Sequence, residues 1–208
     1  MGAHAFIGHE AGLPDWHDFP AWRDAQPSDP PATPLADDDE CNIIYSSGTT
    51  GLPKGIVHTH RRRLDWAYDL ALALRYHCGA RTLCSLGLYS NISWAGFLCT
   101  LLAGGTVVIM RAFEPRALLE IVSRERITHG AMVPLQFQRI LELPDFDRYD
   151  VSSLRSLMCC GSPLPPALKA ATIRRLGCEL IELYGLTEGL ITTLAPEDVE
   201  RKLASVGK

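Results

Sequence analysis

Tyr45-Ser-Ser-Gly-Thr-Thr-Gly-Leu-Pro-Lys-Gly55 is the stretch that says most about the fold and chemistry of this chain. Apolar runs at residues 42–45 and 56–57 border it, which indicates a loop between two strands. Glycines let backbone N–H groups approach a ligand, hydroxyl groups donate further hydrogen bonds, and Lys54 adds a positive charge. This composition is typical of a loop that wraps an anion, and a polyphosphate is the natural ligand.

The loop differs from a Walker A loop, in which the lysine leads directly into a helix. Here the strand-like run Gly55-Ile-Val-His-Thr-His60 follows Lys54. We therefore expect a phosphate to be held between two strands, without a helix dipole behind it. The alternative is a Gly-rich hairpin or linker that binds nothing, and a lysine between two apolar strands argues against it.

Strand-like and helical patterns alternate beyond this loop. The expected strands are 81–86, 106–110, 128–133, 154–159 and 178–183, and the expected helices are 61–76, 93–103, 115–124, 135–143 and 165–175, the last capped by Gly177. Repeated units of this kind predict an α/β fold, with a mainly parallel sheet flanked by helices on both faces.

The first 40 residues have a different composition. A strand-like run at 4–7 precedes a proline-rich stretch, which ends in the acidic run 37–40. We predict a short strand plus a connection over 1–40, with at most a short helix at 16–24. Residues 41–208 are predicted to form a nucleotide-binding α/β subdomain.

Composition excludes several classes of protein. The net charge of −4 does not suggest a nucleic-acid partner, and no apolar run reaches the roughly 20 residues of a membrane span. The seven cysteines include no CxxC pair, so we interpret them as reduced, buried side chains of a cytoplasmic protein rather than as a metal site.

Two further polar segments follow expected strands. Tyr184-Gly-Leu-Thr-Glu188 comes after the strand at 178–183, and Cys160-Gly-Ser-Pro163 comes after the strand at 154–159. Ligands of parallel sheets bind at the carboxyl ends of strands. Tyrosine stacks on a base, threonine bonds a phosphate and glutamate holds Mg²⁺. Each segment taken alone is equally typical of a plain turn.

Together the three segments resemble the adenylate-forming superfamily, which includes acyl- and aryl-CoA synthetases, luciferases and the adenylation domains of peptide synthetases. Residues 45–55 are similar to its phosphate loop, Tyr-Thr/Ser-Ser-Gly-Thr-Thr-Gly-x-Pro-Lys-Gly, at nearly every position. Gly161-Ser-Pro-Leu164 resembles its adenine-contact turn, and residues 184–188 resemble its Tyr-Gly-x-Thr-Glu motif. The resemblance runs from about residue 4 to the end of the chain.

The resemblance implies ATP, Mg²⁺ and, as co-substrate, coenzyme A. A carboxylic acid would attack the α-phosphate of ATP to give an acyl-adenylate, and a thiol would then displace AMP. The residues implied to grip the β- and γ-phosphates are Ser46, Ser47, Gly48, Thr49, Thr50, Gly51 and Lys54. Those implied to frame adenine are Gly161, Ser162, Pro163, Tyr184 and Gly185. Thr187 would contact the α-phosphate, and Glu188 would bind Mg²⁺.

The chain also departs from the family pattern. No aspartate-bearing, strand-rich segment for the ribose follows residue 188, and no hinge or late catalytic lysine is present. We therefore expect a central fragment of the large N-terminal domain, which does not complete the reaction alone.

The acyl pocket is expected at Leu86-Gly-Leu-Tyr-Ser-Asn-Ile-Ser-Trp94. Amino-acid-activating relatives place an aspartate there, whereas here the nearest position is Asn91 and no carboxylate is present. Since burying an unpaired ammonium is costly, the sequence favours a fatty or aromatic acid over an amino acid. Tyr89, Asn91 and Trp94 are the candidate lining residues, and Trp94 is equally compatible with a place in the core.

Two polar clusters follow the loop. His58 and His60 share a strand face, which suits a metal site, but no third ligand lies nearby in the sequence. Arg61-Arg62-Arg63 either adds positive potential near the phosphates or begins a solvated helix, and the sequence favours the second. For the whole chain, the alternatives to an acid–CoA ligase are a non-catalytic nucleotide-binding module and part of an amino-acid adenylation domain.

Overall fold

The computed structural model describes residues 6–8, 16–46, 52–199, 201–202 and 204–208. The chain divides into two compact units, 1–36 and 37–208. In the first unit, β1 (Phe6–Gly8) pairs in parallel with β2 (Trp16–Asp18), and α1 (Phe19–Asp24) follows. The predicted short helix is thus present, but it begins only at Phe19, where the Asp18 carboxylate accepts a hydrogen bond from the backbone N–H of Ala21 at 3.3 Å.

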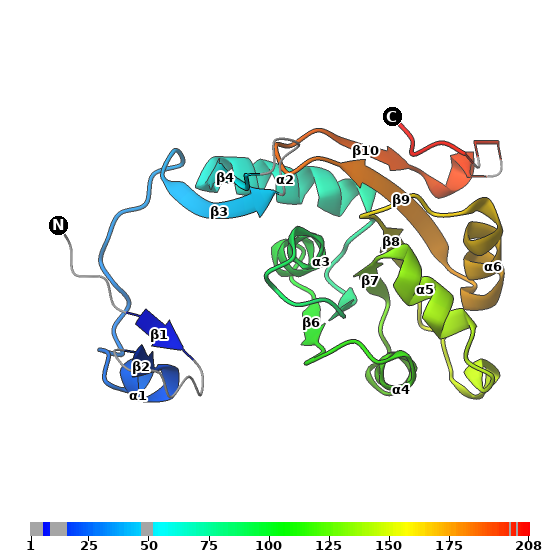
Figure 1. The fold of residues 1–208 in the computed structure, drawn as a ribbon, viewed down its shortest axis with the longest axis horizontal. Coiled ribbons are helices and arrows are strands. Elements are labelled where there is room, and N and C mark those ends of the chain that lie inside the picture. Colours follow the sequence, from blue (N-terminus) through cyan, green and yellow to red (C-terminus); the bar gives the residue numbers. More distant parts are fainter. Residues whose placement is uncertain (1–5, 9–15, 47–51, 200, 203) are drawn as a thin grey trace. The chain divides into compact units, whose positions relative to one another are not determined.

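The second unit is built on a sheet with the strand order β10-β9-β8-β7-β5-β6 (Figure 1). Neighbouring strands are parallel except for β10, which runs antiparallel to β9 at one edge. The strands are β5 (Arg81–Cys84), β6 (Thr106–Ile109), β7 (His129–Met132), β8 (Ser156–Cys159), β9 (Glu179–Gly185) and β10 (Ile191–Leu194). The helices are α2 (His60–Ala73), α3 (Asn91–Leu102), α4 (Pro115–Glu125), α5 (Pro134–Leu141) and α6 (Pro166–Leu176).

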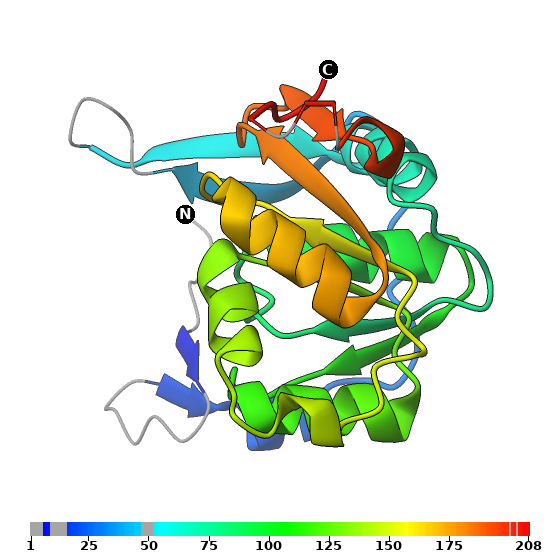
Figure 2. The ribbon, with the colours of Figure 1, turned by 90° about the vertical axis from the view of Figure 1, so that its right-hand side faces the viewer.

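Both faces of this sheet are covered by helices. On β8, Leu157 and Cys159 join the core formed with α4, α5 and α6, whereas Met158 points to the opposite core, formed with α2 and α3. The strict alternation follows from the two-residue period of a strand. In Figure 2 the helices α5 and α6 lie in front of the strands. The predicted α/β fold, a mainly parallel sheet flanked by helices on both faces, is confirmed.

The predicted phosphate loop lies in a β-hairpin. β3 (Glu40–Ser46) and β4 (Lys54–Thr59) pair antiparallel, and Ser46 faces Lys54 as the last pair before the loop. Ser47, Gly48, Thr49, Thr50 and Gly51 fall outside the described residues. The expectation that the loop connects two strands is therefore confirmed, and α2 begins directly after β4 with Thr59 as its N-cap.

Some element boundaries differ from the sequence prediction. α2 ends at Ala73 instead of residue 76, because Arg75 takes a left-handed conformation with φ of 63°. β9 continues to Gly185, and β10 was not predicted at all. Short 3₁₀ turns, η1 (Phe146–Arg148) and η2 (Pro196–Asp198), were also not predicted. Among the described residues, we find no helix with both the length and the apolarity needed to cross a bilayer.

Candidate nucleotide and acid site

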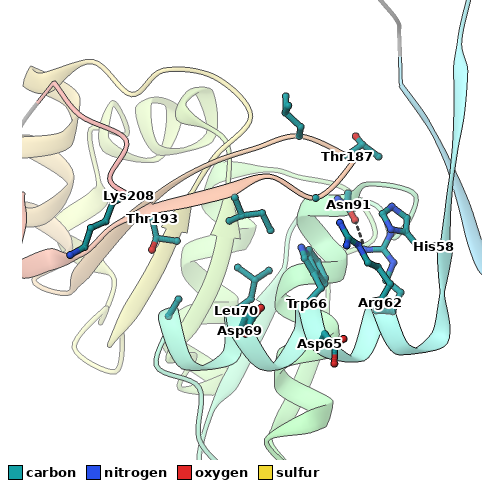
Figure 3. Close-up of a pocket in the computed structure, with 15 residues that line it drawn as sticks. His58, Arg62, Asp65, Trp66, Asp69, Leu70, Asn91, Thr187, Thr193 and Lys208 are labelled. Atoms are coloured by element: carbon teal, nitrogen blue, oxygen red, sulfur yellow. Dashed lines mark hydrogen bonds between the residues drawn. The ribbon is translucent and has the colours of Figure 1, made fainter. Parts of the chain in front are cut away.

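Two adjoining cavities lie where the carboxyl ends of β8 and β9 meet α2 and α3. Their volumes are about 350 and 180 Å³. The residues that line both cavities are Trp66, Leu70, Asn91, Leu186, Thr187 and Ile191. Figure 3 shows His58, Arg62 and Asn91 gathered near Thr187, with Trp66 and Leu70 further along α2. The site thus occupies the edge of the sheet at which parallel α/β proteins bind their ligands.

Several residues implied by the motifs come together there. Gly161, Gly185, Thr187 and Asn91 all line the smaller cavity. Gly161 lies in the turn after β8, Gly185 ends β9, Thr187 lies in the turn that follows β9, and Asn91 is in the first turn of α3. The backbone of Gly161 has φ of 94°, which a residue with a Cβ rarely adopts.

Other implied residues lie outside the two cavities. Ser162, Pro163 and Glu188 are exposed, and Tyr184 is 47% exposed. Lys54 is exposed beside Ser46 at the last strand pair of the hairpin. These side chains are open to solvent at the hairpin and at the edge of the sheet.

Two of the three candidate acyl-pocket residues also lie outside the two cavities at the edge of the sheet. Tyr89 is 91% exposed. Trp94 lines a separate cavity of about 400 Å³ between α2 and α3, where its indole Nε1 donates to the Leu88 carbonyl at 2.7 Å. The ring of Trp94 packs edge-to-face on Phe97, with centroids 5.8 Å apart. Of the three candidates, only Asn91 faces the cavities at the sheet edge.

The turn that carries Thr187 and Glu188 is tied to α2. The Arg62 guanidinium Nη2 donates to the Glu188 carbonyl at 2.9 Å. Gly189 has φ of 112°, and a Cβ added to it would lie 2.0 Å from Arg62 Nη2. Glycine is therefore favoured at 189 by its backbone conformation, and a Cβ at this position would require the end of the Arg62 side chain to shift. The Glu188 carboxylate stays exposed at this turn, and one carboxylate with substrate phosphates is a usual ligand set for Mg²⁺.

Arg63 is buried, and sequence reasoning missed its role. Its guanidinium is placed by hydrogen bonds to two amide oxygens, Asn42 Oδ1 at 2.8 Å and Asn91 Oδ1 at 3.1 Å. The expectation of a solvated helix start holds for Arg61, which is exposed and pairs with Asp37, and is wrong for Arg63, which is 6% exposed. The helical period could have predicted the burial of Arg63, because residues 63, 67 and 70 share one face of α2 and all three are buried.

His58 lies beside these arginines and is also 6% exposed. Burial is the main cause that lowers the pKa of His58, and the positive charges of Arg63 and Arg62 lower it further. A hydrogen bond to the backbone of Thr187 opposes that shift. His58 is therefore neutral at pH 7. In the described part of the chain, no three His, Cys, Asp or Glu side chains are grouped closely enough to hold a metal ion.

A buried ion pair supports the turn after β8. Lys169 Nζ of α6 and Glu182 Oε2 of β9 are 2.5 Å apart, and both side chains are almost fully buried. The other carboxylate oxygen, Glu182 Oε1, accepts the backbone N–H of Leu164 at 3.3 Å. Leu164 directly follows Gly161-Ser-Pro163, so the carboxylate holds the end of the turn that is expected to contact adenine.

The fold and the site together define an α/β domain with two adjoining cavities at the carboxyl ends of its strands. Comparison with known proteins then gives the family. The model of the AMP-binding enzyme family matches residues 5–208. This chain belongs to that family, and the predicted resemblance is confirmed.

Several relatives of this chain are named as CoA synthases or CoA ligases. A feruloyl-CoA synthase of Amycolatopsis sp is 36% identical over 189 residues, which is 88% of this chain and 38% of the relative. The inhibitor-bound N-terminal domain of FACL13 from Mycobacterium tuberculosis is 30% identical with a TM-score of 0.84, over 94% of this chain and 50% of that one.

A third relative was solved with nucleotide. O-succinylbenzoate coenzyme A synthetase from Bacillus subtilis, in complex with ATP and magnesium ion, is 31% identical with a TM-score of 0.74, over 84% of this chain and 36% of that one. This chain thus spans half or less of the length of the relatives it matches.

Proposed function

We propose that this chain takes part in the ATP-dependent activation of a carboxylic acid, followed by thioester formation with coenzyme A. In the first step the carboxylate oxygen attacks the α-phosphorus of ATP, and pyrophosphate leaves. In the second step the thiolate of coenzyme A attacks the acyl carbon, and AMP leaves. The observation that carries the proposal is the meeting of Gly161, Gly185 and Thr187 in one cavity of a chain that belongs to this family.

Each part of the proposed site has a distinct role. Ser46, Lys54 and the loop between them would neutralise the charge of the β- and γ-phosphates, since phosphoryl chemistry depends mostly on positioning and electrostatics. The turn at 161–163 would frame adenine together with Tyr184. Thr187 would donate to the α-phosphate, and Glu188 would hold the Mg²⁺ that the family uses with ATP.

The acid that this site favours lacks an α-ammonium group. Asn91 lines the cavity in place of a carboxylate, and its side-chain oxygen accepts a hydrogen bond from the buried Arg63 guanidinium. A positive charge at this position repels a substrate ammonium. Asp65 and Asp69 line only the larger cavity, where both are exposed on α2, and Asp65 points away from the group near Thr187 (Figure 3).

We propose further that the 208 residues bind the nucleotide but do not complete the reaction alone. The test uses non-hydrolysable mimics of the intermediate, namely 5′-O-(N-acylsulfamoyl)adenosines that carry an octanoyl, benzoyl or phenylalanyl group. Calorimetry should show that the octanoyl or benzoyl mimic binds at least tenfold more tightly than AMP, while acid-dependent release of pyrophosphate stays at background.

Each other outcome points to a different function. Mimics that bind no better than AMP would favour a non-catalytic nucleotide-binding module. Preference for the phenylalanyl mimic would favour an amino-acid adenylation domain. Thioester formation by these residues alone, at the rate of longer relatives, would overturn the proposal that the 208 residues do not complete the reaction alone.

A further inference from the structure

Arg63 is a buried cation without a carboxylate partner among the described residues. It is 6% exposed, and none of the ion pairs found in the described ranges includes it. Burial lowers the pKa of Arg63, yet a guanidinium stays protonated in proteins. Buried charges are normally paired, because an isolated ion loses much of its solvation free energy. The arrangement therefore calls for an anion.

The partners that Arg63 does have are neutral. Two amide oxygens accept from it, and the ring of Trp66 lies 5.0 Å from its guanidinium carbon. A cation–π contact compensates only part of the cost of burial. The remaining nitrogen, Nη2, is buried without a hydrogen-bond partner among the described residues, and so is His58 Nε2. Both side chains line the larger cavity. Because buried polar atoms normally have a hydrogen-bond partner, the two unsatisfied atoms indicate a hydrogen-bonding ligand in this cavity.

The anion expected at Arg63 is distinct from the triphosphate expected at the hairpin loop, because the two sites lie apart. Arg63 bonds Asn42, which pairs with His58 near the base of the hairpin, whereas the phosphate loop begins after Ser46. Ser46 lies four positions beyond Asn42 along β3, which corresponds to about 13 Å at about 3.3 Å per residue. The other contact of Arg63 is Asn91, the residue that faces the proposed acid pocket. The anion expected at Arg63 thus lies on the acid side of the site.

We propose that the acid activated here carries a second anionic group, in the simplest case a second carboxylate, which Arg63 and Asn91 receive. One carboxylate would become the adenylate near Thr187, and the other end of the acid would pair with the Arg63 guanidinium. This inference rests on the proposed function and narrows its substrate class. A charge-assisted contact with a buried arginine is strong and geometrically specific, so it would discriminate sharply against an uncharged end.

The test compares acylsulfamoyl adenosines that differ only at the far end of the acyl chain. Succinyl, glutaryl and adipoyl mimics are each measured against the isosteric terminal amide by calorimetry on the 208-residue chain. Because the reacting carboxylate is already converted in these mimics, any preference reports the second group alone. We expect at least one length to bind tenfold or more tightly as the acid than as the amide.

Variants at position 63 test whether Arg63 causes the preference for the acid over the amide. Arg63→Met should abolish it and Arg63→Lys should keep part of it, whereas Arg61→Met, which changes the exposed neighbour paired with Asp37, should keep all of it. Circular dichroism and thermal melts establish that each variant is folded, and Arg63→Lys serves as the test if Arg63→Met does not fold.

Two results would overturn the inference alone: acids and amides that bind equally, both above AMP, or a preference that survives in Arg63→Met. Mimics that all bind no better than AMP would overturn the proposed function and this inference with it.

Discussion

Lys169 and Glu182 form a buried ion pair beneath the turn that is expected to contact adenine, with Nζ and Oε2 2.5 Å apart. The pair joins α6 to β9, and Glu182 also accepts the backbone N–H of Leu164. A buried pair of this kind is weak evidence for stability, because desolvation offsets much of the attraction. The hydrogen bond from Leu164 to Glu182 links the pair to the end of the turn, so we expect the pair to affect the position of the turn.

Removing only the cation of this pair should lower the stability of the protein. Lys169→Met leaves the Glu182 carboxylate buried without its partner, and we expect the free energy of unfolding to fall by about 3–5 kcal/mol. Urea titration of the two proteins measures this difference. A loss below about 1 kcal/mol would show that water or another group satisfies Glu182.

The double variant Lys169→Met/Glu182→Leu separates stability from positioning. Without either charge, the core should regain most of the lost free energy of unfolding. The backbone N–H of Leu164 nevertheless loses its acceptor, and one hydrogen bond contributes about 1 kcal/mol. If the turn loses that free energy of positioning, the affinity for AMP falls about fivefold. We expect a stable protein with weaker binding of AMP. Unchanged AMP affinity in this double variant would mean that the ion pair does not position the turn.

Gly189→Ala tests the link between α2 and the turn that carries Thr187 and Glu188. The new Cβ meets Arg62 Nη2, and the positive φ strains any residue other than glycine, at about 1–3 kcal/mol. We expect the affinity for MgATP to fall about tenfold or more. The matched control is Gly177→Ala, because Gly177 also has positive φ but a Cβ there meets nothing within 4 Å. Equal MgATP affinity in both variants would refute a role for the Arg62 contact.

His129 should make stability depend on pH. It is 1% exposed between Tyr76 and His77, and its Nε2 lies 3.3 Å from the Arg75 carbonyl oxygen. Burial lowers the pKa of His129 from 6.5 to about 4. Between these values the unfolded chain binds a proton that the folded protein does not, so stability falls as the pH falls, by up to about 3 kcal/mol.

Below about pH 4 the folded protein also binds that proton, and this contribution changes no further. Urea titrations at pH 7.0, 5.5 and 4.5 on the wild type and on His129→Gln isolate it, because the carboxyl groups titrate alike in both proteins. Parallel pH profiles for the two proteins would contradict the assignment.

The sequence predicted the parallel sheet and its helices because each long element has a clear period and a glycine or proline boundary. It also predicted that the phosphate loop connects two strands, but not that these strands pair with each other. β10 was missed because a four-residue edge strand is defined by its pairing with β9 and not by its own pattern. Arg63 was missed because a run of three arginines is usually solvated, and its burial depends on Asn42 and Asn91, which lie 21 and 28 residues away.

The most direct test of the central claim, that this chain holds MgATP through its hairpin loop, is a calorimetric titration of the wild type and two lysine variants. Lys54→Met removes the loop cation, whereas Lys202→Met changes a surface lysine that pairs with Asp198. We predict saturable binding of MgATP at one site per chain, weakened at least tenfold by Lys54→Met and unchanged by Lys202→Met. Absence of saturable binding, or equal binding by the wild type and Lys54→Met, would contradict the account.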